Sequence, residues 1–197
     1  MFEGTMTELG PFELTGTVLR ISDPCYDRDV WCCGTIENCV PGTWEAAILT
    51  KDEGIWGERV SVLTARHVTG PKHTAINQAV CNGTGTWHIC NFNVGVDSGQ
   101  AGIFDDAHYQ DNTVFEPGTE CNQDFGDLWY SYCCNLTLSR TRAGVLPYGT
   151  VASSGYGDGG YECVKHRNKE GKVDFVFIVF IGDDEEDDDT EIDEKQL

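Results

Sequence analysis

The run VDFVFIVFI at residues 173–181 decides the fold class, because every residue from position 175 onward is apolar. A strand that is apolar on both faces belongs in the middle of a sheet whose two sides are covered. The segment YECVKHR at residues 161–167 precedes it, and NKEG at residues 168–171 lies between them. A four-residue connection that ends in glycine is a common hairpin loop. The sequence therefore predicts a β-hairpin whose second strand is central in its sheet.

The rest of the chain also reads as short strands and turns, because no window of about 12 residues shows helical periodicity free of Gly and Pro. A second hairpin is predicted between residues 43–49 and 59–63. A short helix is expected within residues 120–134, starting near Asn122 or Asp124. The predicted fold is mainly β, a β-rich α+β protein with at most one or two short helices, built as an open antiparallel sandwich or a partly closed barrel. Further strands are expected at residues 13–22, 86–96, 149–153 and around 137–138.

Length and charge indicate one acidic domain followed by a tail. The chain has 197 residues and a formal net charge of −20, and residues 183–197 hold ten acids against one base. We expect a single β-rich globular domain over residues 1–182 and a disordered acidic tail over residues 183–197. The body keeps a charge of −11, which repels nucleic acid and anionic membranes. Direct nucleic-acid binding is not expected, although an acidic surface can mimic nucleic acid.

We expect neither a signal peptide nor a membrane span from this sequence. The start MFEGTMTEL has neither a basic region nor an apolar core, as a signal peptide would. The apolar run at residues 173–181 is less than half of the roughly 20 residues needed to cross a bilayer. We therefore expect a cytoplasmic protein without a membrane segment, in which the ten cysteines are mostly buried thiols and not disulfides.

Three clusters of Gly, Asp and Tyr, at residues 22–26, 95–105 and 153–161, each follow a predicted strand. An Asp in a turn often accepts backbone N–H bonds, which is a purely structural use. The functional interpretation is that the strand ends converge and form a binding site, since loops on a rigid sheet commonly carry binding groups. The predicted ligand-binding residues are Asp23, Tyr26, Asp97, Ser98, Gln100, Tyr156, Asp158 and Tyr161.

The sequence gives only weak signals for a phosphate-binding loop, a zinc site or a cysteine nucleophile. The Gly-rich residues 155–160 lack the Lys-Ser/Thr pair of a phosphate loop and lead into a strand instead of a helix. A zinc site could use cysteines from residues 25–39, or His88 and Cys90 if they share one strand face, but no Cys-x-x-Cys pair is present. No local signature marks a cysteine nucleophile. We assign no catalytic residue, and the metal and the cofactor stay unknown.

The three clusters resemble elements of an uncharacterised domain family of bacteria and phages. The matching segments are Asp23-Pro24-Cys25-Tyr26, GVDSGQAG at residues 95–102 and YGDGGY at residues 156–161. Similarity extends to DEGIWGERV at residues 52–60, so that it spans most of residues 18–182. The resemblance implies a shared fold and a microbial or viral intracellular setting, and it implies no chemistry, because the family has no established activity. This chain departs from the family in its cysteine content and its tail.

The expected function is that of a non-enzymatic intracellular binding or interaction protein. Its Asp/Gly/Tyr loops would hold a small polar ligand, a cation or a protein partner, and a phage-type inhibitor directed at a host protein is one form of this hypothesis. The alternative is a hydrolase or transferase that uses a carboxylate cluster, with or without a metal. A structural protein that acts through oligomerisation is a third hypothesis. Whether the protein is an enzyme stays open, with the interpretation leaning against it.

Overall fold

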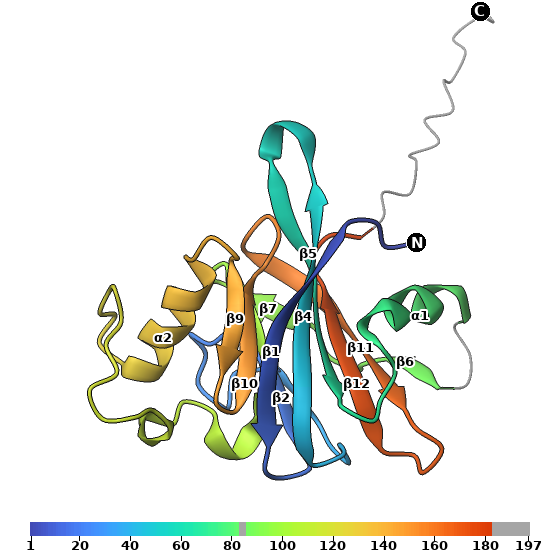
Figure 1. Ribbon diagram of the computed structural model, residues 1–197, viewed down its shortest axis with the longest axis horizontal. Coiled ribbons are helices and arrows are strands. Elements are labelled where there is room, and N and C mark those ends of the chain that lie inside the picture. Colours follow the sequence, from blue (N-terminus) through green and yellow to red (C-terminus); the bar gives the residue numbers. More distant parts are fainter. Residues whose placement is uncertain (83–85, 183–197) are drawn as a thin grey trace, which may run out of the picture.

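The computed structural model describes residues 1–82 and 86–182, which form two antiparallel sheets packed face to face (Figure 1). Both sheets are open, so the predicted β-rich sandwich with few helices is confirmed. The predicted acidic tail lies outside the described residues. In the described part of the chain, none of the helices has the length and apolar character needed to cross a membrane.

The larger sheet contains both predicted hairpins. Its central strand is β12 (Val173–Val179), which pairs with β5 on one side and β11 on the other, as the apolar run at its sequence positions predicts. Phe175 and Phe177 face one side of this strand and Val176 and Ile178 the other, and all four are buried. The strand order is β1 (Thr5–Leu14), β4 (Gly42–Asp52), β5 (Glu58–His67), β12, β11 (Gly159–Arg167) and β6 (Trp87–Ile89), and β7 (Val94–Val96) pairs with the start of β11.

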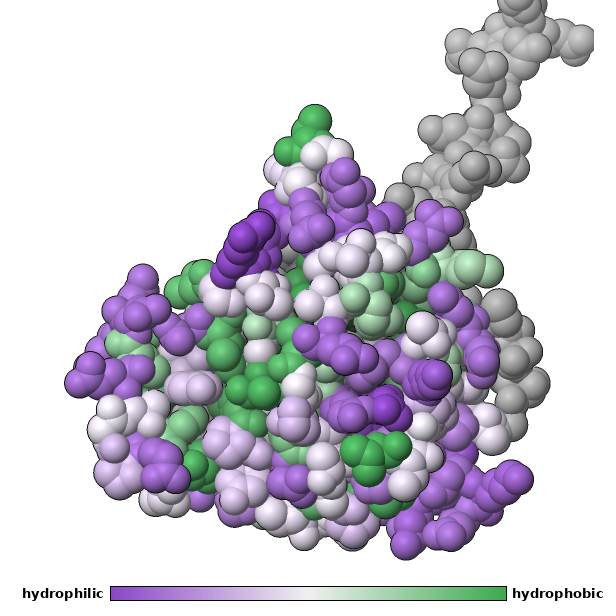
Figure 2. All heavy atoms as spheres, viewed as in Figure 1, coloured by the Kyte–Doolittle hydropathy of each residue, from purple (hydrophilic) through white to green (hydrophobic). Residues whose placement is uncertain are grey.

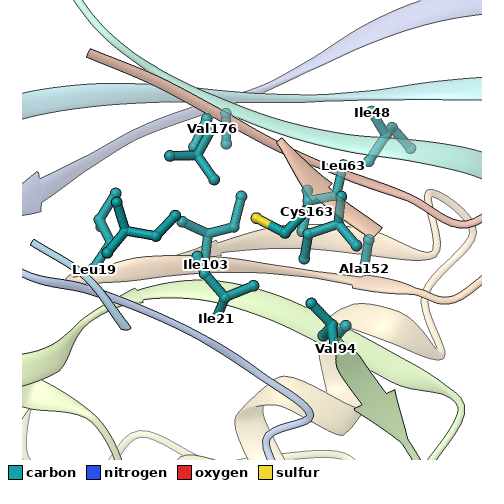
Figure 3. Close-up of a cluster of buried hydrophobic side chains, with 14 of the residues drawn as sticks. Leu19, Ile21, Ile48, Leu63, Val94, Ile103, Ala152, Cys163 and Val176 are labelled. Atoms are coloured by element: carbon teal, nitrogen blue, oxygen red, sulfur yellow. The ribbon is translucent and has the colours of Figure 1, made fainter. Parts of the chain in front are cut away.

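The smaller sheet covers the inner face of the larger one. Figure 3 shows the side chains that fill the space between them, among them Ile103 from the smaller sheet and Leu63 and Val176 from the larger one. Apolar area removed from water at this interface is the main source of stability. The order of strands in this sheet is β3 (Gly34–Ile36), β2 (Leu19–Ser22), β8 (Gln100–Asp105), β10 (Gly149–Ser153) and β9 (Ala143–Leu146).

Two short helices cover the outer faces of the sandwich. Helix α2 (Leu128–Thr137) packs Trp129 and Cys133 against Phe104 of β8. Helix α1 (Ile76–Asn82) lies on the other side, where its first residue packs with Phe175 and Phe177 of β12. Single 3-10 turns occur at η1 (Gly54–Trp56), η2 (His73–Ala75), η3 (Asp106–His108) and η4 (Asn112–Val114).

The strand predicted at residues 13–22 is wrong as a single element. The chain leaves the larger sheet at the end of β1, turns, and enters the smaller sheet as β2. Thr15 holds this corner, because its backbone N–H and its hydroxyl both donate to the Asp105 carboxylate, at 2.7 and 2.6 Å. The partner lies 90 residues away along the chain, so local patterning does not reveal the corner.

Four other elements differ from the prediction. Residues 100–105, assigned to a loop cluster, form β8, and all six are buried. The strand expected around residues 137–138 is the end of α2, whose N-cap is Asp127 and not Asn122 or Asp124. The strand expected at residues 86–96 is divided into β6 and β7, which pair with different parts of β11. Helix α1 was not predicted.

Candidate functional site

The Asp23 carboxylate joins the loop after β2 to the loop between β7 and β8. Its Oδ2 accepts the backbone N–H groups of Asp97 and Ser98, at 2.9 and 2.7 Å, and its Oδ1 accepts the Ser98 hydroxyl at 2.6 Å. Oδ1 also accepts the Cys25 N–H at 2.8 Å, which closes the turn that follows β2. The residue is fully buried. Asp23 therefore fastens two loops that lie 74 residues apart.

The loop between β10 and β11 joins the same assembly. The Ser154 N–H donates to the Gly99 carbonyl at 3.0 Å. The Tyr161 hydroxyl shapes this loop from within, because it lies 3.0 Å from the Ser154 carbonyl and 2.6 Å from that of Gly157. All three predicted loops thus meet at one end of the sandwich. We call residues 23–26, 97–99 and 154–158 the loop cluster.

Two acidic residues of the loop cluster, Asp97 and Asp158, directly adjoin the last paired residues of β7 and β11. In the antiparallel pairing of β7 with β11, the last pair is Val96 with Gly159, so Asp97 and Asp158 are the next residues beyond this pair on the two adjacent chains. Both are exposed. Neither forms an ion pair within residues 1–82 and 86–182. The carboxylates therefore present negative charge to solvent.

Tyr26 is hydrogen-bonded to one of these carboxylates, that of Asp97. Burial of its ring, together with hydrogen bonds to the Asp97 carboxylate and the Cys32 thiol, holds the pKa of the Tyr26 phenol well above its usual range. The phenol stays protonated at physiological pH and donates to Asp97. Tyr26 therefore orients Asp97 without neutralising its charge.

The neighbouring Cys25 is not set up as a nucleophile. Partial burial, together with the adjacent Asp23 carboxylate as hydrogen-bond partner and as charge, raises the pKa of the Cys25 thiol to about 12. Reactive cysteines need a low pKa, because the thiolate is the nucleophile. At neutral pH this thiol is protonated.

Gln100 and Tyr156 point away from the centre of the loop cluster. Gln100 is buried, its amide nitrogen lies 3.3 Å from the Cys134 sulfur, and its amide oxygen accepts the Thr137 hydroxyl at 3.1 Å. The nitrogen and the oxygen of the Gln100 amide thus both contact α2. Tyr156 is 57% exposed, and its hydroxyl donates to the Glu53 carboxylate in the β4–β5 hairpin.

Trp31 is a surface residue beside the loop cluster that we did not predict. Its side chain is 89% exposed. The next residue, Cys32, contacts Tyr26 and accepts the Gly95 N–H at 2.7 Å, which places Trp31 next to the loop that carries Asp97. The sequence did contain a signal, because Trp31 comes shortly after the charged run Asp27-Arg28-Asp29, where a Trp has little reason to be present for packing.

The described residues do not have the geometry that the predicted zinc site or a metal-binding carboxylate cluster would need. In the two described segments, no group of three or more His, Cys, Asp or Glu side chains is arranged to hold a metal ion. The predicted shared face of His88 and Cys90 is wrong, because β6 ends at Ile89, His88 is exposed and Cys90 is buried. The nine cysteines whose side chains are described are free thiols, and most are buried, as predicted.

Comparisons of the chain with protein-family models, with curated proteins and with solved structures found no match. The resemblance to the bacterial and phage domain family therefore stays a prediction from its motifs. Function has to be inferred from the loop cluster itself.

Proposed function

We propose that the protein is a non-enzymatic binding protein whose loop cluster recognises a positively charged partner. The observation that carries this proposal is the placement of Asp97 and Asp158. The β7–β11 pairing places these two exposed residues on adjacent chains just beyond its last pair, and neither has a cationic partner in the described part of the chain. Like charges at neighbouring positions repel, so their proximity costs stability. A cationic group bound between them would offset that repulsion.

Two exposed aromatic rings, one beside the loop cluster and one at its edge, support the same partner chemistry. Trp31 and Tyr156 are 89% and 57% exposed. Lysine and arginine side chains bind over aromatic faces, and Trp is the best of the aromatic residues for this contact. A surface that combines carboxylates with aromatic rings therefore suits Lys or Arg side chains.

The hydrogen bonding of the buried Asp23 carboxylate argues for a binding protein and against an enzyme. Both oxygens of Asp23 are occupied by four hydrogen bonds from the protein. A general acid or base needs an oxygen within hydrogen-bond reach of its substrate. Asp23 has the role of a structural link, so both of its oxygens are occupied and are not available to a hydrolase or transferase that uses a carboxylate cluster.

A protein segment fits this surface better than a small molecule. Small-ligand sites are concave and bury 70–90% of their ligand, whereas the outer groups of the loop cluster are open to solvent. Two hollows, of about 340 and 250 Å³, lie beside the start and the end of α2 and away from the loop cluster. Of the ligands considered from the sequence, the geometry thus favours a protein partner over a small polar ligand or a cation.

The proposed setting is the cytoplasm, with a basic protein as the partner. The net charge of −20 accelerates association with basic surfaces and opposes nucleic acid and anionic lipid. A phage-type inhibitor that occupies a basic surface of a host protein is one form of this proposal.

The test is binding to an array of peptides that contain Lys and Arg, each paired with a scrambled peptide of equal charge. We expect sequence-selected peptides to bind the wild type and to bind the Asp97→Asn/Asp158→Asn double variant about 10-fold more weakly, from two exposed ion pairs of up to about 1 kcal/mol each. Glu37→Gln, at an exposed acid outside the loop cluster, is the matched control and should bind as the wild type does.

Two results would contradict the proposal. One is equal binding of selected and scrambled peptides, which would show a charge effect without recognition. The other is turnover of a panel of esters, phosphoesters and peptides that disappears in Asp97→Asn, which would make the protein an enzyme.

A further inference from the structure

The hairpin between β4 and β5 projects from the sandwich and carries exposed apolar side chains at its end (Figure 1). We call residues 52–58 the hairpin tip. Ile55 is 96% exposed and Trp56 is 61% exposed, and Figure 2 shows hydrophobic atoms at the outer end of this projection. Single exposed apolar residues are ordinary on protein surfaces. Two adjacent ones, one of them a Trp, at the end of a projection are better placed for contact with another molecule than for packing within this one.

The hairpin tip is held in one conformation. Gly54 and Gly57 adopt φ values of 62° and 70°, which L side chains rarely tolerate. Their N–H groups are bonded to the Asp52 carboxylate at 3.0 Å and to the Gly54 carbonyl at 3.0 Å. The Arg59 guanidinium donates to the Trp56 carbonyl at 3.0 Å. Such order reduces the conformational entropy lost on binding.

Two acids flank the apolar pair. Asp52 and Glu58 are directly opposite each other in the register of the hairpin, and both are exposed. Like charges opposite each other destabilise a strand pair. A partner that brings cations to this position would relieve the repulsion, so the hairpin tip has the same charge preference as the loop cluster.

The hairpin tip and the loop cluster are joined by the hydrogen bond from Tyr156 to Glu53. In Figure 1 the orange loop between β10 and β11 lies near the base of the projecting hairpin. One partner surface can therefore contact both. The apolar residues of the tip stand at one end of this combined surface, and the carboxylates of the loop cluster at the other.

We propose that the hairpin tip inserts Ile55 and Trp56 into an apolar pocket of a protein partner whose pocket rim carries Lys or Arg. Buried aromatic anchors surrounded by polar contacts are typical of binding hot spots. The inference rests on the proposed function only in assuming that the partner is a protein with a basic surface. The acidic charge of the chain argues against an anionic membrane as the occupant.

The first experiment places the photo-crosslinking residue p-benzoylphenylalanine at position 55 in the full-length protein, in the cells that make it. The matched control carries the same residue at position 138, where Leu138 is 68% exposed at the end of α2. We expect one protein to be crosslinked from position 55 and not from position 138. That protein is then purified, and its dissociation constant is measured for the wild type and for variants.

Trp56→Ala should weaken binding of the crosslinked protein by about 30-fold or more, as truncation of a hot-spot residue does. The Asp52→Asn/Glu58→Gln variant should slow association and reduce its salt dependence, because rim charges act on the association rate. Leu138→Ala should bind as the wild type does. Circular dichroism should show all variants folded, since each changed side chain is exposed.

Several outcomes would overturn the inference: crosslinking that is equal from both positions or absent, a crosslinked product that is a second copy of this chain, or a partner that binds Trp56→Ala unchanged. Flotation of the wild type, but not of Trp56→Ala, with phosphatidylcholine/phosphatidylglycerol vesicles would assign the hairpin tip to membranes instead.

The two proposals can be told apart with the same partner. Loss of partner binding in Trp56→Ala with full binding in Asp97→Asn/Asp158→Asn would uphold the role of the hairpin tip and contradict that of the loop cluster. The reverse pattern would uphold the loop cluster alone.

Discussion

Replacement of Asp23 by Asn should destabilise the fold strongly although it changes few atoms. The carboxylate accepts three backbone N–H groups and one hydroxyl in a fully buried position. Each oxygen of Asp23 accepts at least one backbone N–H. In Asp23→Asn, an NH₂ group replaces one of these oxygens, so a donor would face a donor whichever way the amide is turned. An unsatisfied buried donor costs about 1–3 kcal/mol, and the remaining bonds lose the strengthening that a charged acceptor provides. We expect Asp23→Asn to lower the free energy of unfolding by roughly 2–4 kcal/mol.

The measurement is urea unfolding followed by tryptophan fluorescence, with Asp158→Asn as the control. Asp158 is exposed in the same loop cluster, so its replacement should change the unfolding free energy by less than about 0.5 kcal/mol. Ser98→Ala removes one of the four donors and should cost about 1 kcal/mol. A loss below about 1 kcal/mol in Asp23→Asn would refute the structural role of this carboxylate.

Two further predictions concern stability. Burial, and then the nearby Arg66 charge, lowers the pKa of the His73 imidazole to about 4, so the unfolded chain binds its proton first. The stability from neutral His73 should be complete above about pH 6.5 and lost as the pH falls toward 4, by on the order of 2 kcal/mol, and His73→Gln should remove this part of the pH dependence of urea midpoints. In Gly95→Ala the added Cβ would lie 2.7 Å from the Cys32 Cβ, so thermal unfolding should show a loss of about 1–3 kcal/mol, and an unchanged midpoint would mean that the two loops separate easily.

Local patterning was sufficient for the two hairpins and for the position of β12. Phe175 and Phe177 alternate with Val176 and Ile178, and apolar residues at every position allow only a strand that is covered on both sides. It was insufficient at Thr15, where the chain moves from one sheet to the other. That corner depends on a distant carboxylate, which no short window contains.

The candidate site was predicted in its location more than in its chemistry. Asp-rich turns after strands indicated that three loops matter, and these loops do meet. Which Asp is buried and which is exposed depends on the pairing of β7 with β11 and on the approach of β2. The sequence motifs therefore did not separate Asp23, a structural link, from Asp97 and Asp158, which face solvent.

The central place of β12 also constrains how the protein can fold during synthesis. The first three strands of the larger sheet, β1, β4 and β5, are neighbours and leave the ribosome early, but β5 meets β11 only through β12, which is made after both. Until residue 179 has emerged, β5 and β11 each keep an unpaired edge, and such edges pair readily with other chains. A nascent chain that stalls before β12 is therefore expected to be more prone to aggregation than the finished protein, and a chaperone that shields these two edges would act during translation of the final strand.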